Sequence, residues 1–507
     1  MTDTATKPST AIALRRRLLR RAVPALALAA MTALAACAQA PATGRTIFTG
    51  GLSQEKEEEI GQQQYRQIKK GEAFGGPYEE NAELTSYVAS IGRLLAKTSE
   101  MPDIKWTFTV LDTPIVNAFA TPGGYIYVTR GLVALAENEA ELAGVLAHEI
   151  GHVTARHMAE RYGQSVIAQV LNLGAAVALG GGMETQAIGA LSAVMLRSYS
   201  REQEFEADTL GVRYLTRAGY EPEAMASFLA KLQEHSRLEA KMRGQPGAAD
   251  KFNIMQTHPR TADRVEAAIQ AAAGRRVTDP IVARDIYLDK IDGMIYGDSP
   301  EQGMVRGREF LHPDLRFAFE VPRGFHVVNG EQQVVAFGPD DALIVFDSVK
   351  VDRGISMRDF LTRQWAKDVR LSRVERINVN GMEAATGETR LNTRDGARDL
   401  RLVAYRYGGQ RVYRFMFVTE PGQTASFNEA FRRTTYSFRR LSDEEALAIK
   451  PYRLDVQRVQ RGETLSGIAR AMPYDDFQLE RLAVLNGLDK NDNLVAGQRI
   501  KTVIVGN

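Results

Sequence analysis

The chain has 507 residues, which is long enough for two or three domains, and its 64 basic and 62 acidic residues give a formal net charge of +2. Six of the basic and one of the acidic residues lie within positions 1–36, so that 58 basic and 61 acidic residues remain beyond them, a net charge of −3. The basic excess therefore belongs to the leader and gives no charge-based case for nucleic-acid binding. The single cysteine, Cys37, excludes an internal disulfide.

Residues 1–36 have the parts of a bacterial lipoprotein signal peptide. A basic start is followed by a small, apolar stretch at 22–36 that is too short and too rich in alanine to span a bilayer comfortably. The stretch ends at Leu34-Ala35-Ala36-Cys37, which resembles a lipobox. We expect cleavage before Cys37 and acylation of its thiol, although a plain signal peptide with an incidental cysteine is the alternative. Ala38 in place of an aspartate favours sorting to the outer membrane, facing the periplasm.

Two amphipathic helices are expected at 53–75 and 80–98, followed by a strand. The strand has alternating β-branched and aromatic residues after the turn at Gly123-Gly124. As an edge strand beside a catalytic site it could pair with an extended substrate backbone, and as an ordinary core strand it would not. The residues expected to bind substrate in this way are Tyr125, Ile126, Tyr127 and Val128.

The segment His148-Glu149-Ile150-Gly151-His152 carries the strongest chemical signal of the chain. Residues four apart share a face of a helix, so His148 and His152 can present two imidazoles to one tetrahedral zinc ion. Glu149 lies beside them and can take a proton from a metal-bound water. The apolar residues around the motif predict a largely buried helix, in which two histidines and a glutamate need polar partners.

A zinc hydrolase needs a third protein ligand. Ala155 and Met158 occupy the glycine and third-histidine positions of the extended three-histidine motif, which excludes that arrangement, and His157 is out of register and is expected to be structural or exposed. Glu204 and Asp208 share a face of a second predicted helix. Glu204 could bind the metal and Asp208 could accept the N–H of a ligand histidine, while a solvated, acidic first turn is the alternative.

Two further segments bear on the same site. His258 precedes a proline in a polar loop and could approach the zinc, where it would either donate to the oxyanion or block the open position as a fourth ligand. The alternative is an ordinary loop histidine. The apolar segment 165–196 is interrupted by glycines and is expected to form a pair of helices or a mobile lid, since neither half would span a bilayer.

Four motifs in order resemble one family of enzymes. The stretches 117–132, 148–152, 200–211 and 257–264 resemble the HtpX-like, BepA-like and CAAX-prenyl-endopeptidase-like zinc metallopeptidases, which are gluzincins. The resemblance covers roughly residues 50–270. It implies one zinc ion per chain with His148, His152 and Glu204 as ligands and Glu149 as general base.

The pattern changes after about residue 275. Alternating strands are expected at 316–321, 334–337, 342–348, 385–389, 402–407 and 412–418, with a helix at 424–434. These elements predict a small α+β domain with an antiparallel sheet, in which no catalytic constellation is found. Its role is either binding or structural support.

The stretch 452–504 resembles a LysM module, a small β-α-α-β unit that commonly binds N-acetylglucosamine glycans. The resemblance rests on residues 459–469, 485–488 and 494–500. Residues 472–476 depart from the usual spacing, so a purely structural module is the alternative to peptidoglycan binding.

Together these segments predict an α+β protein of several parts. A signal peptide at 1–36 precedes a mainly helical, zincin-type metallopeptidase domain with a small sheet at 37–275, an α+β domain at 280–445 and a LysM-like domain at 452–504. The leading hypothesis is a lipid-anchored periplasmic zinc endopeptidase that degrades misfolded or stalled envelope proteins. A non-catalytic tether between outer membrane and peptidoglycan, and a protease acting on wall-associated peptides, are the alternatives.

Overall fold

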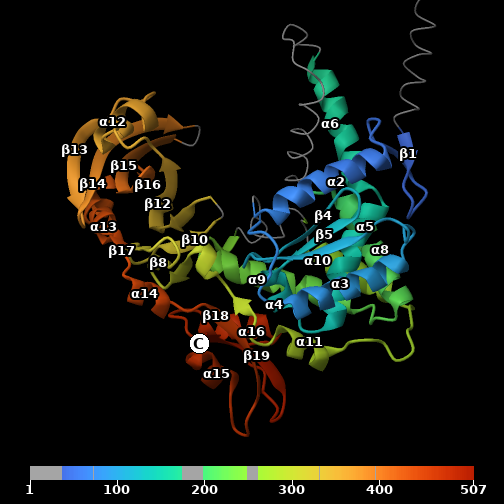
Figure 1. Cartoon of the computed structure of the whole chain (residues 1–507). Helices are drawn as coiled ribbons and strands as arrows, with labels where there is room; N and C mark the ends of the chain where they lie inside the picture. Colours follow the sequence, from blue (N-terminus) through green and yellow to red (C-terminus); the bar gives the residue numbers. More distant parts are fainter. Residues whose placement is uncertain are drawn as a thin grey trace, which may run out of the picture.

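The computed structural model describes residues 37–71, 74–173, 198–247, 258, 261–330, 332–393 and 396–506 (Figure 1). The predicted signal peptide at 1–36 and most of the apolar segment at 165–196 lie outside the described residues. Among the helices within these ranges, none is long and apolar enough to cross a membrane. The expected α+β class is confirmed, because long helices and antiparallel sheets both contribute to the chain.

The first half is built from helices around one hydrophobic core. Helix α5 (Glu139–Thr154) is buried along nearly its whole length, and its first turn is capped by the side chain of Asn138, which accepts a hydrogen bond from the backbone N–H of Glu141. The remaining helices of this half are α2 (Gln54–Lys69), α3 (Ala82–Lys97), α4 (Arg130–Leu135), α6 (His157–Leu173), α8 (Arg201–Ala218), α9 (Ala224–Met242), α10 (Thr261–Ala272) and α11 (Arg284–Ile291).

Two glycines let α5 and α8 approach closely. A Cβ atom at Gly151 would lie 3.0 Å from the carbonyl oxygen of Ala207, and one at Gly211 would lie 3.2 Å from the backbone nitrogen of His148. Any larger residue at these positions would push the helices apart, because close-packed interiors leave no room for added volume. The crossing brings the acidic residues at the start of α8 beside the histidines of α5.

A three-stranded sheet with the order β3-β5-β4 lies against α5. Strand β5 (Tyr125–Thr129) pairs in parallel with β3 (Thr107–Leu111) and antiparallel with β4 (Ala118–Thr121). The prediction that Tyr125–Val128 forms an edge strand for substrate is therefore wrong. Strand β5 is the central strand, and all five of its residues are buried. The edge nearest to α5 is formed by β4.

The N-terminal part of the described chain is a hairpin of β1 (Cys37–Gln39) and β2 (Thr46–Phe48). The backbone N–H of Ala42 donates to the carbonyl oxygen of Thr154 at the end of α5. A Cβ at Gly163 of α6 would lie 2.1 Å from the carbonyl oxygen of Phe48, so the hairpin is tightly packed on α6. The hairpin is therefore attached directly to the helices that carry the candidate site.

The second half has two antiparallel sheets and forms the yellow and orange body in Figure 1. A seven-stranded sheet has the order β10-β11-β12-β16-β15-β14-β13, and a four-stranded sheet has the order β17-β9-β8-β7. The elements are β7 (Met304–Arg306), β8 (Glu309–His312), β9 (Phe317–Glu320), β10 (His326–Asn329), β11 (Val334–Phe337), β12 (Leu343–Lys350), α12 (Met357–Phe360), β13 (Ser372–Val379), β14 (Met382–Thr393), β15 (Gly396–Gly408), β16 (Arg411–Thr419), α13 (Thr424–Ser437), β17 (Arg439–Arg440) and α14 (Asp443–Ala448).

The expected strands and the expected helix at 424–434 are confirmed, and β11 has the predicted bounds. Strands β7, β8, β10, β13 and β17 were not expected. Most residues of β13 are at least partly exposed, so it lacks the regular apolar alternation on which strand prediction depends. Side chains of Phe317, Phe346 and Phe415, among others, fill the core between the two sheets.

The C-terminal unit has the predicted β-α-α-β order, with β18 (Tyr452–Arg458), α15 (Leu465–Ala471), α16 (Gln478–Leu485) and β19 (Arg499–Val505). Strand β18 also pairs with β6 (Ile295–Tyr296), which follows the first half of the chain, in a sheet with the order β19-β18-β6. Its apolar residues, such as Leu482 and Ile500, belong to the same core as those of α5. The domain boundaries at 37–275, 280–445 and 452–504 stay a prediction.

Candidate metal centre

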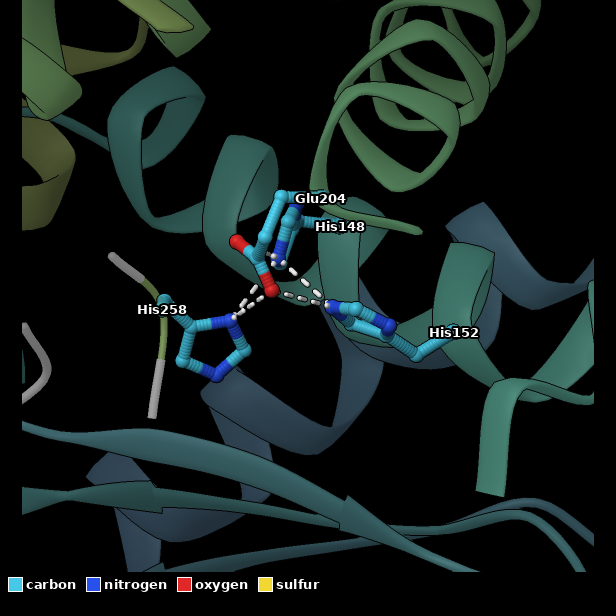
Figure 2. A group of neighbouring side chains, drawn as sticks. All are labelled: His148, His152, Glu204 and His258. Atoms are coloured by element: carbon cyan, nitrogen blue, oxygen red, sulfur yellow. Dashed lines mark hydrogen bonds and ion pairs between the residues drawn. The ribbon is translucent and has the colours of Figure 1, made fainter. Parts of the chain in front are cut away.

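Three histidines and one glutamate converge between α5 and α8. One possible ligand atom from each of His148, His152, Glu204 and His258 lies within 4.8 Å of the others, and all four residues are buried. The Nε2 atoms of His148 and His152 are 3.0 Å apart, and the Nε2 of His152 lies 3.4 Å from the Oε1 of Glu204. Figure 2 shows the four side chains turned toward one another, with His258 arriving from a separate segment.

The other ring nitrogen of each helical histidine has its own partner. The Nδ1 of His148 lies 2.9 Å from the Oδ1 of Asp208, and the Nδ1 of His152 lies 2.8 Å from the Nδ1 of His157. The Nε2 of His157 in turn lies 3.0 Å from a carboxylate oxygen of Glu206. An ionised carboxylate only accepts hydrogen bonds, so Asp208 favours the Nδ1–H tautomer of His148. A His157 ring that donates to Glu206 can accept from the Nδ1–H of His152 and so favours the same tautomer there.

This assignment makes the cluster fit a cation. With their Nδ1 protons directed outward, His148 and His152 face each other through two Nε2 lone pairs that are 3.0 Å apart. A carboxylate oxygen of Glu204 lies beside them, so three atoms that can each offer an electron pair to a cation face one another. Two imidazole nitrogens and a carboxylate oxygen are the ligands typical of a catalytic zinc site, which leaves a further position open.

Arg264 joins Glu204 and Asp208, two of the acidic residues of α8. Its Nη1 lies 2.7 Å from the Oε2 of Glu204, while its Nε and Nη2 donate to the two carboxylate oxygens of Asp208 at 2.8 and 2.7 Å. Burial alone would raise the pKa of both carboxyls, but the guanidinium outweighs it and holds the pKa of Glu204 well below its usual range and lowers that of Asp208. Both groups are therefore anionic, and the alternative of a solvated helix start is excluded because each is only 1% exposed.

Glu149 of α5 lies beside the cluster. The residue is fully buried, and neither of its carboxylate oxygens forms a hydrogen bond with any described residue. Its Oε1 lies 3.7 Å from the Nε2 of His258. Burial raises the pKa of Glu149. A buried carboxylate without a hydrogen bond is costly unless a further group, such as a water or substrate, completes it.

A cavity of about 440 Å³ reaches the cluster from the side of His152. Its wall includes Ala120 and Thr121 of β4, and Tyr199, whose ring stacks on His152 with centroids 3.8 Å apart. Strand β4, an edge strand of the described sheet, therefore contributes to the wall of the cavity that opens onto the candidate site. A second cavity of about 720 Å³ between the two halves and the C-terminal unit contains none of the four clustered side chains.

The structure brings together all the residues predicted around the metal and adds others. His157, expected to be structural or exposed, is completely buried against His152. Arg264 and Tyr199 were also missed as parts of the site. Arg264 had a signal, because it stands six residues after His258 in the same motif, whereas the partner of His157 is 49 residues away in sequence and has no local signal.

Comparison with known proteins agrees with this geometry. Residues 82–272 match the model of peptidase family M48, and residues 458–502 match the model of the LysM domain. Residues 82–272 form an M48 peptidase domain. The clustered residues His148, His152, Glu204 and His258 all lie within it.

The similarity to individual relatives covers only part of the chain. The Beta-barrel assembly-enhancing protease of Escherichia coli (strain K12) is 30% identical over 248 residues, which cover 47% of this chain and 48% of the relative. The Mitochondrial metalloendopeptidase OMA1 of Arabidopsis thaliana is 34% identical over 177 residues, which cover 35% of this chain and 33% of the relative. The chain thus spans about half or less of the length of these relatives. A solved cyanobacterial PsbP from Synechocystis sp. PCC 6803 aligns with 27% of this chain and 94% of its own at 13% identity, with a TM-score of 0.23, and supports no argument.

Proposed function

We propose that the chain is a zinc metalloendopeptidase of the bacterial cell envelope. The observation that carries the proposal is the pair of facing Nε2 atoms of His148 and His152, 3.0 Å apart, beside Glu204 and the buried carboxylate of Glu149, which has no hydrogen bond to any described residue. A structural metal site would not need that carboxylate, which argues against the alternative of a non-catalytic tether. The presence of an M48 domain supports the same conclusion.

Each of these residues has its own role in the proposed reaction. His148, His152 and Glu204 would hold one zinc ion, which when bound supplies Lewis-acid polarisation of the scissile carbonyl and lowers the pKa of a coordinated water. Glu149 takes the proton of the attacking water and later delivers it to the leaving amine. Asp208 holds the ring of His148 in its metal-binding orientation, and Arg264 keeps Glu204 and Asp208 ionised.

We assign substrate binding to strand β4. The edge of β4 that does not face β5 has no strand partner among the described residues, and Ala120 and Thr121 line the cavity that leads to His152. An extended peptide that adds to this edge would be held by backbone hydrogen bonds, which depend little on its sequence. Such recognition suits unfolded or misfolded chains, so protein quality control in the envelope is the proposed role.

His258 takes part in the resting site. Its Nδ1 lies 2.9 Å from the Oε1 of Glu204 and 3.3 Å from the Nε2 of His148, within the set of possible ligands. In this position it would act as a fourth donor that fills the open position, and its departure would leave room for water and substrate. Donation to the oxyanion from a displaced position is the alternative role.

Lipid anchoring and an outer-membrane location are part of the proposal. Cys37 is exposed and begins the first described strand, directly after the lipobox-like Leu34-Ala35-Ala36. The name of the Escherichia coli relative links it to β-barrel assembly, and the LysM domain suggests contact with peptidoglycan. We propose an acylated, periplasm-facing enzyme that acts on envelope proteins, with wall-associated peptides as the alternative substrates.

One experiment tests the catalytic proposal. Zinc content and cleavage of an unfolded protein such as casein are measured for the wild type, Glu149→Gln and the control Glu266→Gln, whose side chain is exposed on α10. We expect about one zinc ion per chain in all three and a cleavage rate about 100- to 10,000-fold lower in Glu149→Gln alone. Full activity of Glu149→Gln would remove Glu149 from the mechanism, and a zinc-free, inactive wild type would overturn the proposed function.

A further inference from the structure

The second helical histidine is oriented by a chain of three side chains rather than by a single carboxylate. The Nδ1 of His152 contacts the Nδ1 of His157, the Nε2 of His157 contacts Glu206, and Glu206 accepts from Arg45 at 3.1 Å. Arg45 also forms a two-pronged ion pair with Glu160 at 2.6 and 2.9 Å. His148 differs, because its Nδ1 directly contacts Asp208.

The direction of these hydrogen bonds can be followed from the carboxylate of Glu206. Glu206 bears an acceptor-only carboxylate, so the Nε2 of His157 must be the donor in their contact. A His157 ring that donates from Nε2 can accept through Nδ1 from the Nδ1–H of His152, 2.8 Å away. This series of contacts accommodates the Nδ1–H tautomer of His152, in which the Nε2 that faces the cluster is the atom able to bind a cation.

The alternative tautomer of His152 would be incompatible with metal binding. A proton on its Nε2 would point at the Nε2 of His148, 3.0 Å away, and at the Oε1 of Glu204, 3.4 Å away. It would form hydrogen bonds there and occupy the space of the cation. Within the described part of the chain, the Nδ1 of His152 contacts the buried ring of His157 and no carboxylate, so the choice of tautomer depends on that ring.

Arg45, the last side chain in this series of contacts, lies in the N-terminal hairpin. Arg45 directly precedes β2, and the hairpin is held to the site helices by the bond from Ala42 to Thr154 and by Arg213 of α8, whose Nη1 donates to the carbonyl oxygen of Ala42 at 3.2 Å. Glu160 accepts from both Arg45 and Gln203, which ties α6 to the start of α8. The position of Glu206 is therefore set by three separate segments of the chain.

We propose that His157, Glu206 and Arg45 form a positioning relay that fixes the metal-binding tautomer of His152 from the N-terminal hairpin. The relay rests on the proposed function, since it prepares His152 for the zinc ion of that site. None of the three residues contacts the candidate ligand position itself, so their effect passes through His152. Because the imidazole of His157 stands between His152 and Glu206, residues outside α5 and α8 can help to orient the ring of His152.

The relay is tested by matched substitutions at position 157. Gln can accept a hydrogen bond through its oxygen and donate one through its nitrogen, whereas Leu can do neither. We expect His157→Leu to weaken zinc affinity about 10- to 100-fold and His157→Gln to recover most of it. Arg45→Met should weaken affinity by a smaller factor, and the control Arg217→Met, which removes an exposed partner of Glu100 from α8, should leave it unchanged.

Affinity is measured by competition with a chelator, and the visible absorption spectrum of the cobalt-substituted protein reports the ligand geometry independently of activity. Circular dichroism of the metal-free variants checks their fold, and if His157→Leu does not fold, His157→Gln and Arg45→Met decide. The relay alone is overturned if the wild type binds zinc tightly and if His157→Leu and Arg45→Met keep the same zinc affinity and the same cobalt spectrum as the wild type. A wild type without zinc affinity overturns the proposed function, and the relay with it.

Discussion

The ammonium of Lys501, in strand β19, lies 2.9 Å from the carbonyl oxygen of Ala134, in helix α4 of the M48 domain. It also donates to the carbonyl oxygens of Leu135 and Ala136 at 3.1 and 2.8 Å and lies 2.7 Å from a carboxylate oxygen of Glu137. A cation at a helix C-terminus satisfies carbonyl groups that have no partner within the helix. Burial lowers the pKa of Lys501 to about 8, although Glu137 opposes the shift. The LysM domain is thus joined to the peptidase domain through a buried charge.

Lys501→Met should destabilise the whole chain. The substitution keeps the length of the side chain but leaves three helix carbonyls unpaired and removes one partner of the buried Glu137, so we expect a loss of about 3 kcal/mol in the free energy of unfolding. Urea denaturation followed by circular dichroism measures the change. Lys490→Met removes an exposed pair with Glu480 and should stay within about 0.5 kcal/mol of the wild type. An equally small effect of Lys501→Met would show that the contact contributes little.

Asp208→Asn should weaken zinc binding. The amide can still accept a hydrogen bond from the Nδ1 of His148. It loses the negative charge that balances Arg264 and that makes the imidazole of His148 a stronger electron-pair donor to the metal. We expect affinity about tenfold lower in a chelator competition, because second-shell partners of ligand histidines typically contribute 10- to 100-fold. The control is Asp263→Asn, which removes a half-exposed pair with Arg201. Equal affinities of the two variants would contradict the role assigned to Asp208.

Removal of the metal should lower the thermal stability of the M48 domain. Zinc would bind the folded cluster and not the unfolded chain, and a ligand at about 1,000 times its Kd adds about 4 kcal/mol to the free energy of unfolding. Differential scanning calorimetry with zinc and with a chelator should therefore give well-separated transitions for the wild type. Glu204→Ala, which removes one of the clustered donors, should show a much smaller separation. A wild-type transition insensitive to zinc would argue against a metal at this cluster.

Acidification should destabilise the second half of the chain through His312. The side chain is 8% exposed and accepts a hydrogen bond from the backbone N–H of Leu315 at 3.3 Å, which requires a neutral ring. Burial, assisted by Arg411, lowers its pKa from 6.5 to about 4. Between these values the unfolded chain binds more protons than the folded chain, so stability falls as the pH falls, by up to about 1.4 kcal/mol per pH unit.

His312→Asn removes this titration while keeping an acceptor for Leu315. Chemical denaturation of the wild type and the variant at about pH 7 and about pH 5 should show a larger acid-induced loss in the wild type, by about 2 kcal/mol. Parallel losses in the two proteins would assign the acid sensitivity to other groups.

The parts of the site that could be predicted have short-range signals. His148, Glu149 and His152 follow one another on a helical face, and Glu204 and Asp208 repeat that spacing, so a helical period is enough to relate them. The α+β domain was recognisable from strands such as β11, a short run of four apolar residues whose burial alternates. Each of these inferences needs only neighbouring residues.

The parts that were missed depend on contacts between distant segments. Arg45 reaches Glu206 across 161 residues, and no periodicity relates the two positions. The edge position assigned to Tyr125–Val128 failed for a related reason. The apolar composition of Tyr125–Val128 shows in the sequence that the strand is buried. Its central position depends on pairing with β3 on one side and β4 on the other, and that pairing has no local signal.

The bond between Lys501 and Ala134 spans 367 residues of sequence, and it has a consequence for the order of biosynthesis. At about 5–20 residues per second, the ribosome completes Lys501 on the order of 20–70 s after Ala134. During that interval the core shared by α5 and the LysM domain lacks Ile500 and Leu482 and stays open. The apolar core around α5 is therefore completed only when nearly the whole chain has been made.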